Sequence, residues 1–288
     1  MSFVQFFGAL ELGLVYGLAA IAVYLTFRVL DFPDLTVDGS FTLGAAVCSV
    51  LIVGGTSPFL ATLAAFGAGM IAGLVTGFLH IRWKILGLLA GILTMTALYS
   101  INLRIMGRPN IALLTESTLF EGFSFEHQTL VILCLLAFMV IGALTLLLAS
   151  HFGLGLRAAG INPLMSRAYG VSVPQMTFFA LALSNGIVAF AGSLFAQSQK
   201  FADVSIGGGT IIVGLASVIV GESILRTRRI GWALVGCLLG SILYRLAIAF
   251  ALNASDLGLR ASDLNLITTI VVVVTLILPK FRARMKQS

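Results

Sequence analysis

Polar side chains interrupt two long apolar stretches of this sequence, and they are the first candidates for chemistry. Thr36, Asp38 and Ser40 follow the first apolar run, within the segment DFPDLTVDGS. Ser184 and Asn185 lie in the middle of a later apolar run. A polar or ionisable group at membrane depth is costly, so it usually faces the interior of a helix bundle or lines a watery path. These five residues are our candidates for the pathway of a polar solute.

Plain structural roles are also open to these residues. The side-chain oxygens of Asp38, Thr36 and Ser40 could cap the helix that follows them. Asn185 could form a hydrogen bond between helices, as polar residues in membrane bundles often do. The sequence leaves both alternatives open.

Two further charges lie within or next to apolar runs. Arg245 needs a counter-charge, for which Asp256 and Asp263 are the candidates. Glu222 lies close enough to the basic segment RTRR at 226–229 to be neutralised there. A structural role is the simpler interpretation of both.

The residues that usually carry catalysis or bind metals form no pattern here. His80, His127 and His151 are scattered, with no carboxylate cluster at a metal-ligand spacing. The three cysteines stand singly within apolar runs, which is typical of small core residues. The chain also lacks a Gly-rich loop with the Lys-Ser/Thr that cradles nucleotide phosphates. We therefore assign no catalytic or metal-binding residues and expect nucleotide to bind elsewhere.

The composition indicates whether the chain surrounding these groups lies in water or in a lipid bilayer. Of 288 residues, 59% are hydrophobic and only 10% are charged, and the mean hydropathy is +1.09. Soluble domains are nearer half apolar and a quarter charged. The apolar runs repeatedly reach the roughly 20 residues that a helix needs to cross a bilayer. The sequence thus predicts an all-α polytopic membrane protein, with 1–288 forming a single transmembrane domain.

About nine spans are expected, with eight to ten as the range. The second span is short and follows a polar segment, so it is a candidate for a broken or re-entrant element. The predicted spans are 9–30, 40–55, 57–79, 85–104, 128–150, 174–197, 208–225, 231–252 and 263–279.

The basic residues set the expected orientation. Lys and Arg near the ends of spans are retained on the cytoplasmic side. Placing the loop 151–173 inside also puts the segments HIRWK and RTRR and the basic C-terminal tail inside. The N-terminus is then outside and the C-terminus is cytoplasmic. Topology and anionic lipid headgroups account for the net charge of +6, so no nucleic-acid partner is needed.

Two parts of the chain share a pattern. The first and sixth spans each end in a polar stretch that leads into a Gly- and Ala-rich helix. Because five spans separate the two units, they would cross in opposite senses. This pattern predicts an inverted repeat of spans 1–4 and 6–9, an arrangement common among transport proteins.

The loop 151–173 contains a short predicted helix. Asn162-Pro163 is a typical start signal, about two turns follow from Leu164 to Tyr169, and Gly170 is a typical stop. Such a helix is too short to fold alone, so it must lie on the membrane surface or on a partner protein.

This loop resembles the coupling helix of ATP-binding-cassette (ABC) importer permeases of the branched-chain amino acid permease superfamily. The segment DLTVDGSFTLGA at 34–45 resembles the signature of one branch, the tryptophan/tyrosine-type permeases. The resemblance covers nearly the whole chain. The loop residues that match the superfamily pattern are Gly155, Arg157, Ala158, Gly160, Asn162, Pro163, Ala168, Gly170 and Val171.

The resemblance implies a type II ABC importer-like architecture in the bacterial inner membrane. Two permease copies, expected to be a homodimer, would form the pathway. A separate ABC ATPase subunit, which binds ATP and Mg²⁺, would dock on the loop, and a substrate-binding protein would deliver the cargo. This chain would bind no cofactor and catalyse no reaction. The residues implied to couple it to the ATPase are Arg157, Gly160, Asn162, Pro163, Ser166, Arg167, Tyr169 and Gly170.

Alternatives remain for the cargo and for the class of transporter. The resemblance favours an aromatic or branched-chain amino acid, but the same superfamily carries nucleosides and other small solutes. Inverted repeats and broken helices also suit a secondary transporter. For Arg157 and Arg167, retention on the cytoplasmic side is as good an interpretation as contact with acidic residues of an ATPase.

Overall fold

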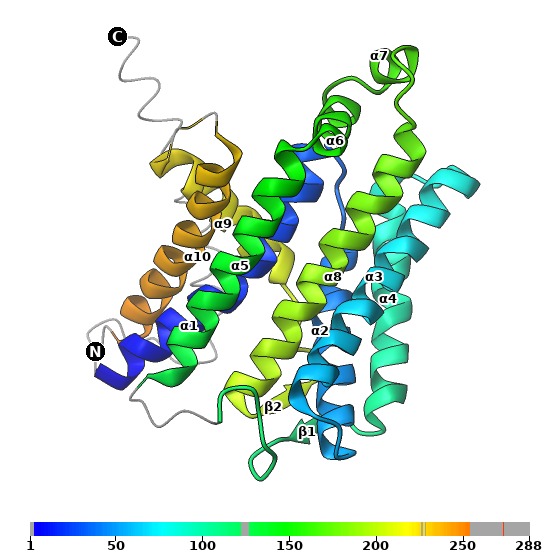
Figure 1. Cartoon of the computed structure of the whole chain (residues 1–288). Helices are drawn as coiled ribbons and strands as arrows, with labels where there is room; N and C mark the ends of the chain where they lie inside the picture. The colour runs from blue at the N-terminus through cyan, green and yellow to red at the C-terminus, as the bar shows by residue number, and fades with distance from the viewer. Residues whose placement is uncertain (1–2, 122–126, 226, 228, 254–272, 274–288) are drawn as a thin grey trace.

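The computed structural model describes residues 3–121, 127–225, 227, 229–253 and 273. Nearly all of this part of the chain is helical, as predicted (Figure 1). The elements in chain order are α1 (Phe3–Val23), the π-helix η1 (Tyr24–Val29), α2 (Thr36–Val53), α3 (Pro58–Trp83), α4 (Gly87–Met106), β1 (Asn110–Ala112), α5 (Gln128–Ala149), α6 (His151–Ile161), α7 (Pro163–Ala168), α8 (Val173–Gln199), β2 (Phe201–Asp203), α9 (Thr210–Ile224) and α10 (Ile230–Asn253).

The number of spans is not confirmed as nine. Within the described residues, seven segments are long and apolar enough to cross a bilayer, and the first combines α1 with η1. The predicted span 208–225 corresponds to α9, which has 15 residues and is shorter than a usual crossing helix. The predicted span 263–279 lies outside the described residues apart from Val273.

Two long helices cross the bundle in opposite directions. In Figure 1, α1 runs from the N-terminus toward α6, whereas α8 runs from α7 toward β2. α8 packs mainly against α2 and α3, and α1 packs mainly against α9 and α10. Glycines permit the closest approaches, because a Cβ on Gly73 of α3 would collide with the backbone of α8 at Leu181.

α2 begins partway along its neighbours and not at the end of the bundle. After η1, the chain turns at Asp31 (φ +57°) and runs back beside α8 before α2 starts at Thr36. At that point α2 contacts Asn185, which is in the middle of α8. α2 therefore starts within the bundle, as expected of an interrupted element.

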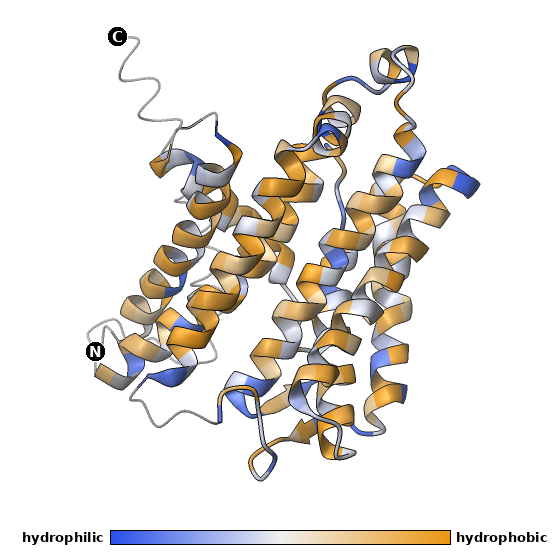
Figure 2. Cartoon of the chain, in the orientation of Figure 1, coloured by the Kyte–Doolittle hydropathy of each residue, from blue (hydrophilic) through white to orange (hydrophobic). Residues whose placement is uncertain are grey.

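α5 forms the most apolar part of the exterior (Figure 2). Its outward side chains include Val131, Leu135, Phe138 and Leu146, each more than half exposed. Water would not solvate such a face favourably, whereas lipid acyl chains would. We therefore interpret this side of the molecule as facing lipid.

The two ends of the bundle differ. At one end α6 and α7 form a protruding helix pair, and at the other β1 and β2 form a small antiparallel ladder (Figure 1). Ile111 pairs with Ala202 at the centre of that ladder. The loop 151–173 thus holds one more helix than predicted, because α6 precedes the short helix.

Candidate functional sites: a protruding loop and a polar centre

Local hydrogen bonds define the short helix α7. The Asn162 side chain accepts a hydrogen bond from the Met165 N–H (3.0 Å), which satisfies a free donor of the first turn. Pro163 occupies the first turn, where its missing N–H does no harm. Ser166 donates its hydroxyl to the Asn162 carbonyl (2.9 Å). Gly170 ends the helix with φ +84°, a conformation that glycine adopts without strain. The predicted short helix is present.

The outer face of the α6–α7 loop is unusually apolar for a loop. Ile161 is 86% exposed, Leu164 78% and Tyr169 77%. A hollow of about 360 Å³ lies beside them, lined in part by Met165 and Val171. A contiguous apolar surface on a protruding element is typical of a protein interaction site.

The inner face of the same loop rests on the end of the first span. A Cβ on Gly160 would collide with the Val29 carbonyl and the backbone of Leu30, so α6 and η1 touch backbone to backbone. Arg157 is half-buried, and its Nε has no hydrogen-bond partner within the described residues. Arg167, in contrast, is exposed.

A polar centre ties α8 to the start of α2. Asn185 donates its Nδ2 to Asp34 Oδ2 (2.7 Å) and accepts a hydrogen bond from the Ser40 hydroxyl at Oδ1 (2.7 Å). The other carboxylate oxygen of Asp34 accepts the Thr36 N–H (2.9 Å). All four side chains are fully buried. Buried polar groups matched in this way specify one packing of the helices.

Two other pathway candidates also make buried contacts between helices. The hydroxyls of Thr36 and Thr76 are 2.7 Å apart, and the Ser184 hydroxyl donates to the Ala22 carbonyl of α1 (2.9 Å). Thr36, Ser40, Ser184 and Asn185 are thus placed in the core, where each is bonded to a neighbouring helix. This matches the alternative role of Asn185, whereas the expected capping of α2 by Thr36 and Ser40 is not seen. Asp34 was not among the five pathway candidates, although its position in DFPDL marks it as a polar residue of the lipid zone.

Asp38 caps a different helix from the one expected. Its carboxylate oxygens accept the N–H groups of Gly209 (2.9 Å) and Ile211 (2.8 Å), at the start of α9. Asp38 itself lies in the first turn of α2, so the predicted capping of the helix that follows it is wrong. The bond instead joins the starts of two helices that are 171 to 173 residues apart in the chain.

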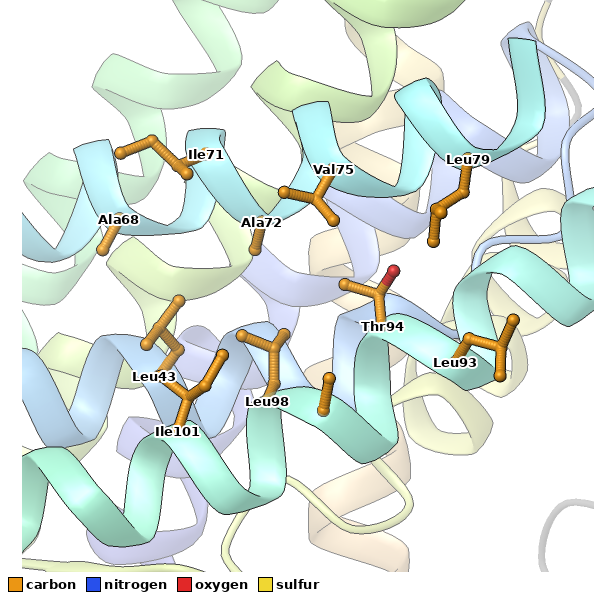
Figure 3. A pocket seen from close by; sticks show the side chains of 11 residues that line it. Leu43, Ala68, Ile71, Ala72, Val75, Leu79, Leu93, Thr94, Leu98 and Ile101 are labelled. Carbon is orange, nitrogen blue, oxygen red and sulfur yellow. The ribbon is translucent and has the colours of Figure 1, made fainter. Parts of the chain in front are cut away.

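Cavities lie on two sides of α4. One, of about 330 Å³, is lined almost entirely by apolar side chains of α3 and α4, including Ile71, Val75 and Leu98 (Figure 3). The Thr94 side chain in this lining already donates its hydroxyl to the Ala90 carbonyl. The other, of about 380 Å³, is lined by Asp38 and a mixture of polar and apolar residues, and most of its exposed surface is apolar. Of the five pathway candidates, Asp38 alone borders this second cavity.

Comparisons with known proteins identify the family. The family model described as the permease component of branched-chain amino acid transport systems matches residues 5–278. The chain belongs to this family of ABC transporter permeases. It is 40% identical to the tyrosine transport system permease protein of Clostridioides difficile over 90% of this chain and 86% of the relative.

More distant relatives show the same family and fold. The permease is 25% identical to a branched-chain amino acid transport permease protein, LivH, of Methanocaldococcus jannaschii, over 88% of this chain and 85% of the relative. The structure of a metal-chelate type ABC transporter in an inward-facing conformation aligns with a TM-score of 0.52 at 15% identity, covering 99% of this chain and 86% of that chain. Permease subunits of this family are not enzymes.

The two charges flagged within the apolar runs of the permease have partners in the structure. Arg28 forms a two-pronged ion pair with Glu222 (2.6 and 3.2 Å), so η1 supplies a partner for Glu222. Two arginines of RTRR, Arg226 and Arg228, lie outside the described residues. Arg245 lies 3.8 Å above the Tyr16 ring, as a cation–π contact. Asp256 and Asp263, its predicted counter-charges, lie outside the described residues.

The end of the permease opposite α7 carries a separate set of charged contacts. Lys200 donates to Glu121, and this bond holds the pKa of the Glu121 carboxyl below its usual value. Hydrogen bonds from the Ser205 hydroxyl and N–H lower the pKa of Asp203 in the same way. The described residues contain no group of three or more His, Cys, Asp or Glu placed to hold a metal.

Proposed function

We propose that this permease is the membrane subunit of a binding-protein-dependent, ATP-driven importer of an aromatic or branched-chain amino acid. The α6–α7 loop carries this proposal, because it combines an exposed apolar surface with a rigid seat on the end of the first span. The relative named as a tyrosine permease favours an aromatic amino acid as cargo.

In this proposal α7 is the coupling helix. A partner ATPase, which binds ATP and Mg²⁺, receives the exposed side chains Leu164, Met165 and Tyr169 in a cleft. Arg167 is exposed beside them and can meet acidic residues of the partner. ATP can change the permease only through differential contacts in two states, and this docked loop supplies them.

The contact of α6 with the end of the first span transmits movement of the loop to the membrane helices. Movement of Gly160 acts directly on the backbone at Val29 and Leu30. The adjoining segment η1 contains Arg28, which is paired with Glu222 near the end of α9. It also precedes Asp34, which is bonded to α8. A shift of the loop thus reaches both α9 and the polar centre.

An inverted repeat is part of the proposal, and a constant offset supports it. The segment FPDLTVDG at 32–39 corresponds to FADVSIGG at 201–208, a shift of 169 residues. The same shift carries 3–29, which is α1 with η1, onto 172–198, close to α8. Asp34 and its counterpart Asp203 each accept the N–H of the residue two positions on. The two helices also run in opposite directions (Figure 1).

The orientation follows from the charges at the two ends. The α6–α7 end carries Arg28, Arg82, Lys84, Arg157 and Arg167 among the described residues. This end is therefore cytoplasmic, and α1 starts outside. In this orientation the ATPase docks at α7 and the substrate-binding protein docks at the β1–β2 end.

A second copy of the chain completes the pathway. Thr96, Tyr99 and Ser100 are exposed near the middle of α4, whereas α5 exposes apolar side chains at the same depth. Exposed polar groups are unfavourable in hydrocarbon, so the α4 face is better suited to a partner copy or a watery path than to lipid.

The test compares a glycine of α6 that packs on the first span with a glycine of α6 that does not. Gly160→Ala places a methyl group against the Val29 carbonyl, so it should abolish amino-acid uptake while the ATPase still binds. Gly155→Ala on the same helix is the matched control, since its methyl group would meet only Met176 and Val171 at an ordinary 3.7 Å. Uptake and ATP hydrolysis are measured in vesicles that hold the full complex. If Gly160→Ala retained ATP-coupled uptake, the proposed transmission of movement from the loop to the first span would be refuted.

A further inference from the structure

The second cavity beside α4, which Asp38 borders, has the size and position of a small-molecule site. Its volume of about 380 Å³ lies where the first turn of α2, the middle of α4 and the segment before α9 meet. Ligand pockets generally begin at about 300 Å³ and combine apolar walls with a few polar groups. Its lining is Asp38, Gly39, Thr42, Met95, Thr96, Tyr99, Asn102, Val204, Ser205 and Gly208.

An unpaired acceptor lies in the wall of this cavity. Asn102 is 1% exposed and donates its Nδ2 to the Gly39 carbonyl (3.3 Å). Its Oδ1 is buried and has no hydrogen-bond partner within the described residues. Buried polar atoms are nearly always paired, so an orphaned carbonyl oxygen points to a donor that the protein does not itself supply.

Asp38 adds a negative charge with spare acceptor capacity. Each of its carboxylate oxygens takes one N–H from the start of α9 and can accept a further hydrogen bond. The hydroxyls of Thr42, Thr96 and Ser205 donate to oxygen atoms of the protein. The few polar groups that the largely apolar walls of the cavity offer are therefore acceptors and a negative charge, which suit a cationic group with several N–H donors.

We propose that this cavity binds the ammonium group of an amino acid in transit, with the Asp38 carboxylate and Asn102 Oδ1 as acceptors. This inference rests on the proposed amino-acid import and adds the chemical group that the permease recognises. Met95 and Tyr99 supply apolar and aromatic surface for the remainder of the cargo. The α9 N–H groups partly neutralise Asp38, so the hold on the ammonium group is weak enough for release.

Protection of a cysteine in the cavity tests the proposal directly. Thr96→Cys, which lines the same cavity but is not assigned a contact with the cargo, is labelled with a thiol reagent in the purified full complex, in lipid nanodiscs without ATP. Tyrosine at twice its Kd should slow labelling by about threefold, because occupancy protects by 1 + [L]/Kd. The analogue of tyrosine that lacks the amino group should give no protection. Equal protection by both compounds, or by neither, overturns the proposal.

Second substitutions in the Thr96→Cys background identify the acceptors. Asp38→Asn keeps an oxygen for the α9 cap but removes the charge, and Asn102→Ala removes the orphaned carbonyl; each should abolish protection by tyrosine. Ile101→Ala in the apolar cavity on the other side of α4 is the control and should retain it. Protection that survives both Asp38→Asn and Asn102→Ala refutes the assignment.

Uptake by the unsubstituted complex separates failure of the site from failure of the proposed function. If vesicles import tyrosine but labelling shows no protection, the site is wrong and the importer proposal stands. If the vesicles import no amino acid, the proposed function itself fails. The cavity is then judged by comparing a cationic with an anionic thiol reagent, and only faster labelling by the cationic reagent upholds a cation-selective cavity.

Discussion

The contact of α8 with α3 is the counterpart of the contact of α1 with α10. In both contacts a glycine lets the two helices approach closely, but the glycine lies on a different member of each pair. In the first, the glycine belongs to α3, and Gly73 meets Leu181 and Ala182 of α8. In the second, the glycine belongs to α1, and Gly13 meets Ile242 of α10. The offset of 169 residues carries Gly13 onto Ala182 and Gly73 onto Ile242. The same contact is thus kept while the small residue changes sides.

The two regions differ more in their polar groups. Asn185 in α8 joins Asp34 and Ser40 by hydrogen bonds, whereas its counterpart in α1 is Tyr16, which stacks on Phe41 and lies under Arg245. One region is specified by hydrogen bonds and the other by aromatic packing. Equivalent backbone positions can therefore hold the same helix arrangement with different side-chain chemistry.

The largest effect is expected from Gly73→Ala. The new methyl group would collide with backbone atoms of α8 that cannot move aside, so we expect a loss of about 3 kcal/mol in the free energy of unfolding. Gly17→Ala should cost only about 1 kcal/mol, because its methyl group meets the flexible end of Leu238. Unfolding in a denaturing detergent measures both, with Gly8→Ala as the open-space control. Equal losses at Gly73 and Gly17 would contradict this distinction.

The next largest loss in the free energy of unfolding is expected from Asn185→Leu. It leaves the buried Asp34 Oδ2 and the Ser40 hydroxyl without their partner, at a cost of about 2 kcal/mol. Tyr16→Phe at the counterpart position keeps the ring and should cost less than about 1 kcal/mol. The same unfolding assay compares them, and a larger loss for Tyr16→Phe would show that this region depends on the Tyr16 hydroxyl and not on ring packing alone.

A smaller effect is expected at Asp203, the half-buried counterpart of Asp34. Bonds from Ser205 lower the pKa of its carboxyl, so Asp203 stabilises the folded state above its unfolded pKa. This contribution is lost as the pH falls through the lower, folded pKa. Asp203→Asn should therefore lower stability slightly at neutral pH and reduce the further loss of stability in acid. Unfolding curves from about pH 6 to about pH 3 cover the transition.

The smallest effect should come from the ion pair of Glu121 with Lys200. The pKa of Glu121 is lowered, so the sign is the same and the stabilisation disappears on acidification below the usual pKa of a glutamate. Because Glu121 is exposed and solvent screens the pair, Glu121→Gln should change acid sensitivity only slightly. A change larger than that of Asp203→Asn would reverse the expected order.

The sequence predicted the features that depend on neighbouring residues. Asn162 and Gly170 flank α7 as expected, since a cap and a stop act within a few residues of themselves. The membrane helices follow from apolar length alone. Pairings across the bundle could not be predicted in this way, because Asp34 with Asn185 and Asp38 with Gly209 join residues 151 and 171 positions apart.

The π-helical segment was also missed, since YLTFRV has no residue that marks it. Its hydrogen bonds depend on what the end of α1 meets in the fold. The shape of the cavities likewise depends on how α4 lies against α2 and α3, which local pattern does not encode. The sequence thus predicted which groups are polar and buried, but not which of them meet.

The six π-helical residues Tyr24–Val29 give the inner end of α1 a second way to respond to force. A π-turn holds one residue more than an α-turn, so conversion to α-helical bonding would advance the following residues by one position, a rotation of about 100° about the axis. Arg28 would then swing out of reach of Glu222. A push from the loop at Gly160 could accordingly be absorbed as a discrete step in winding, without any bend in the helix.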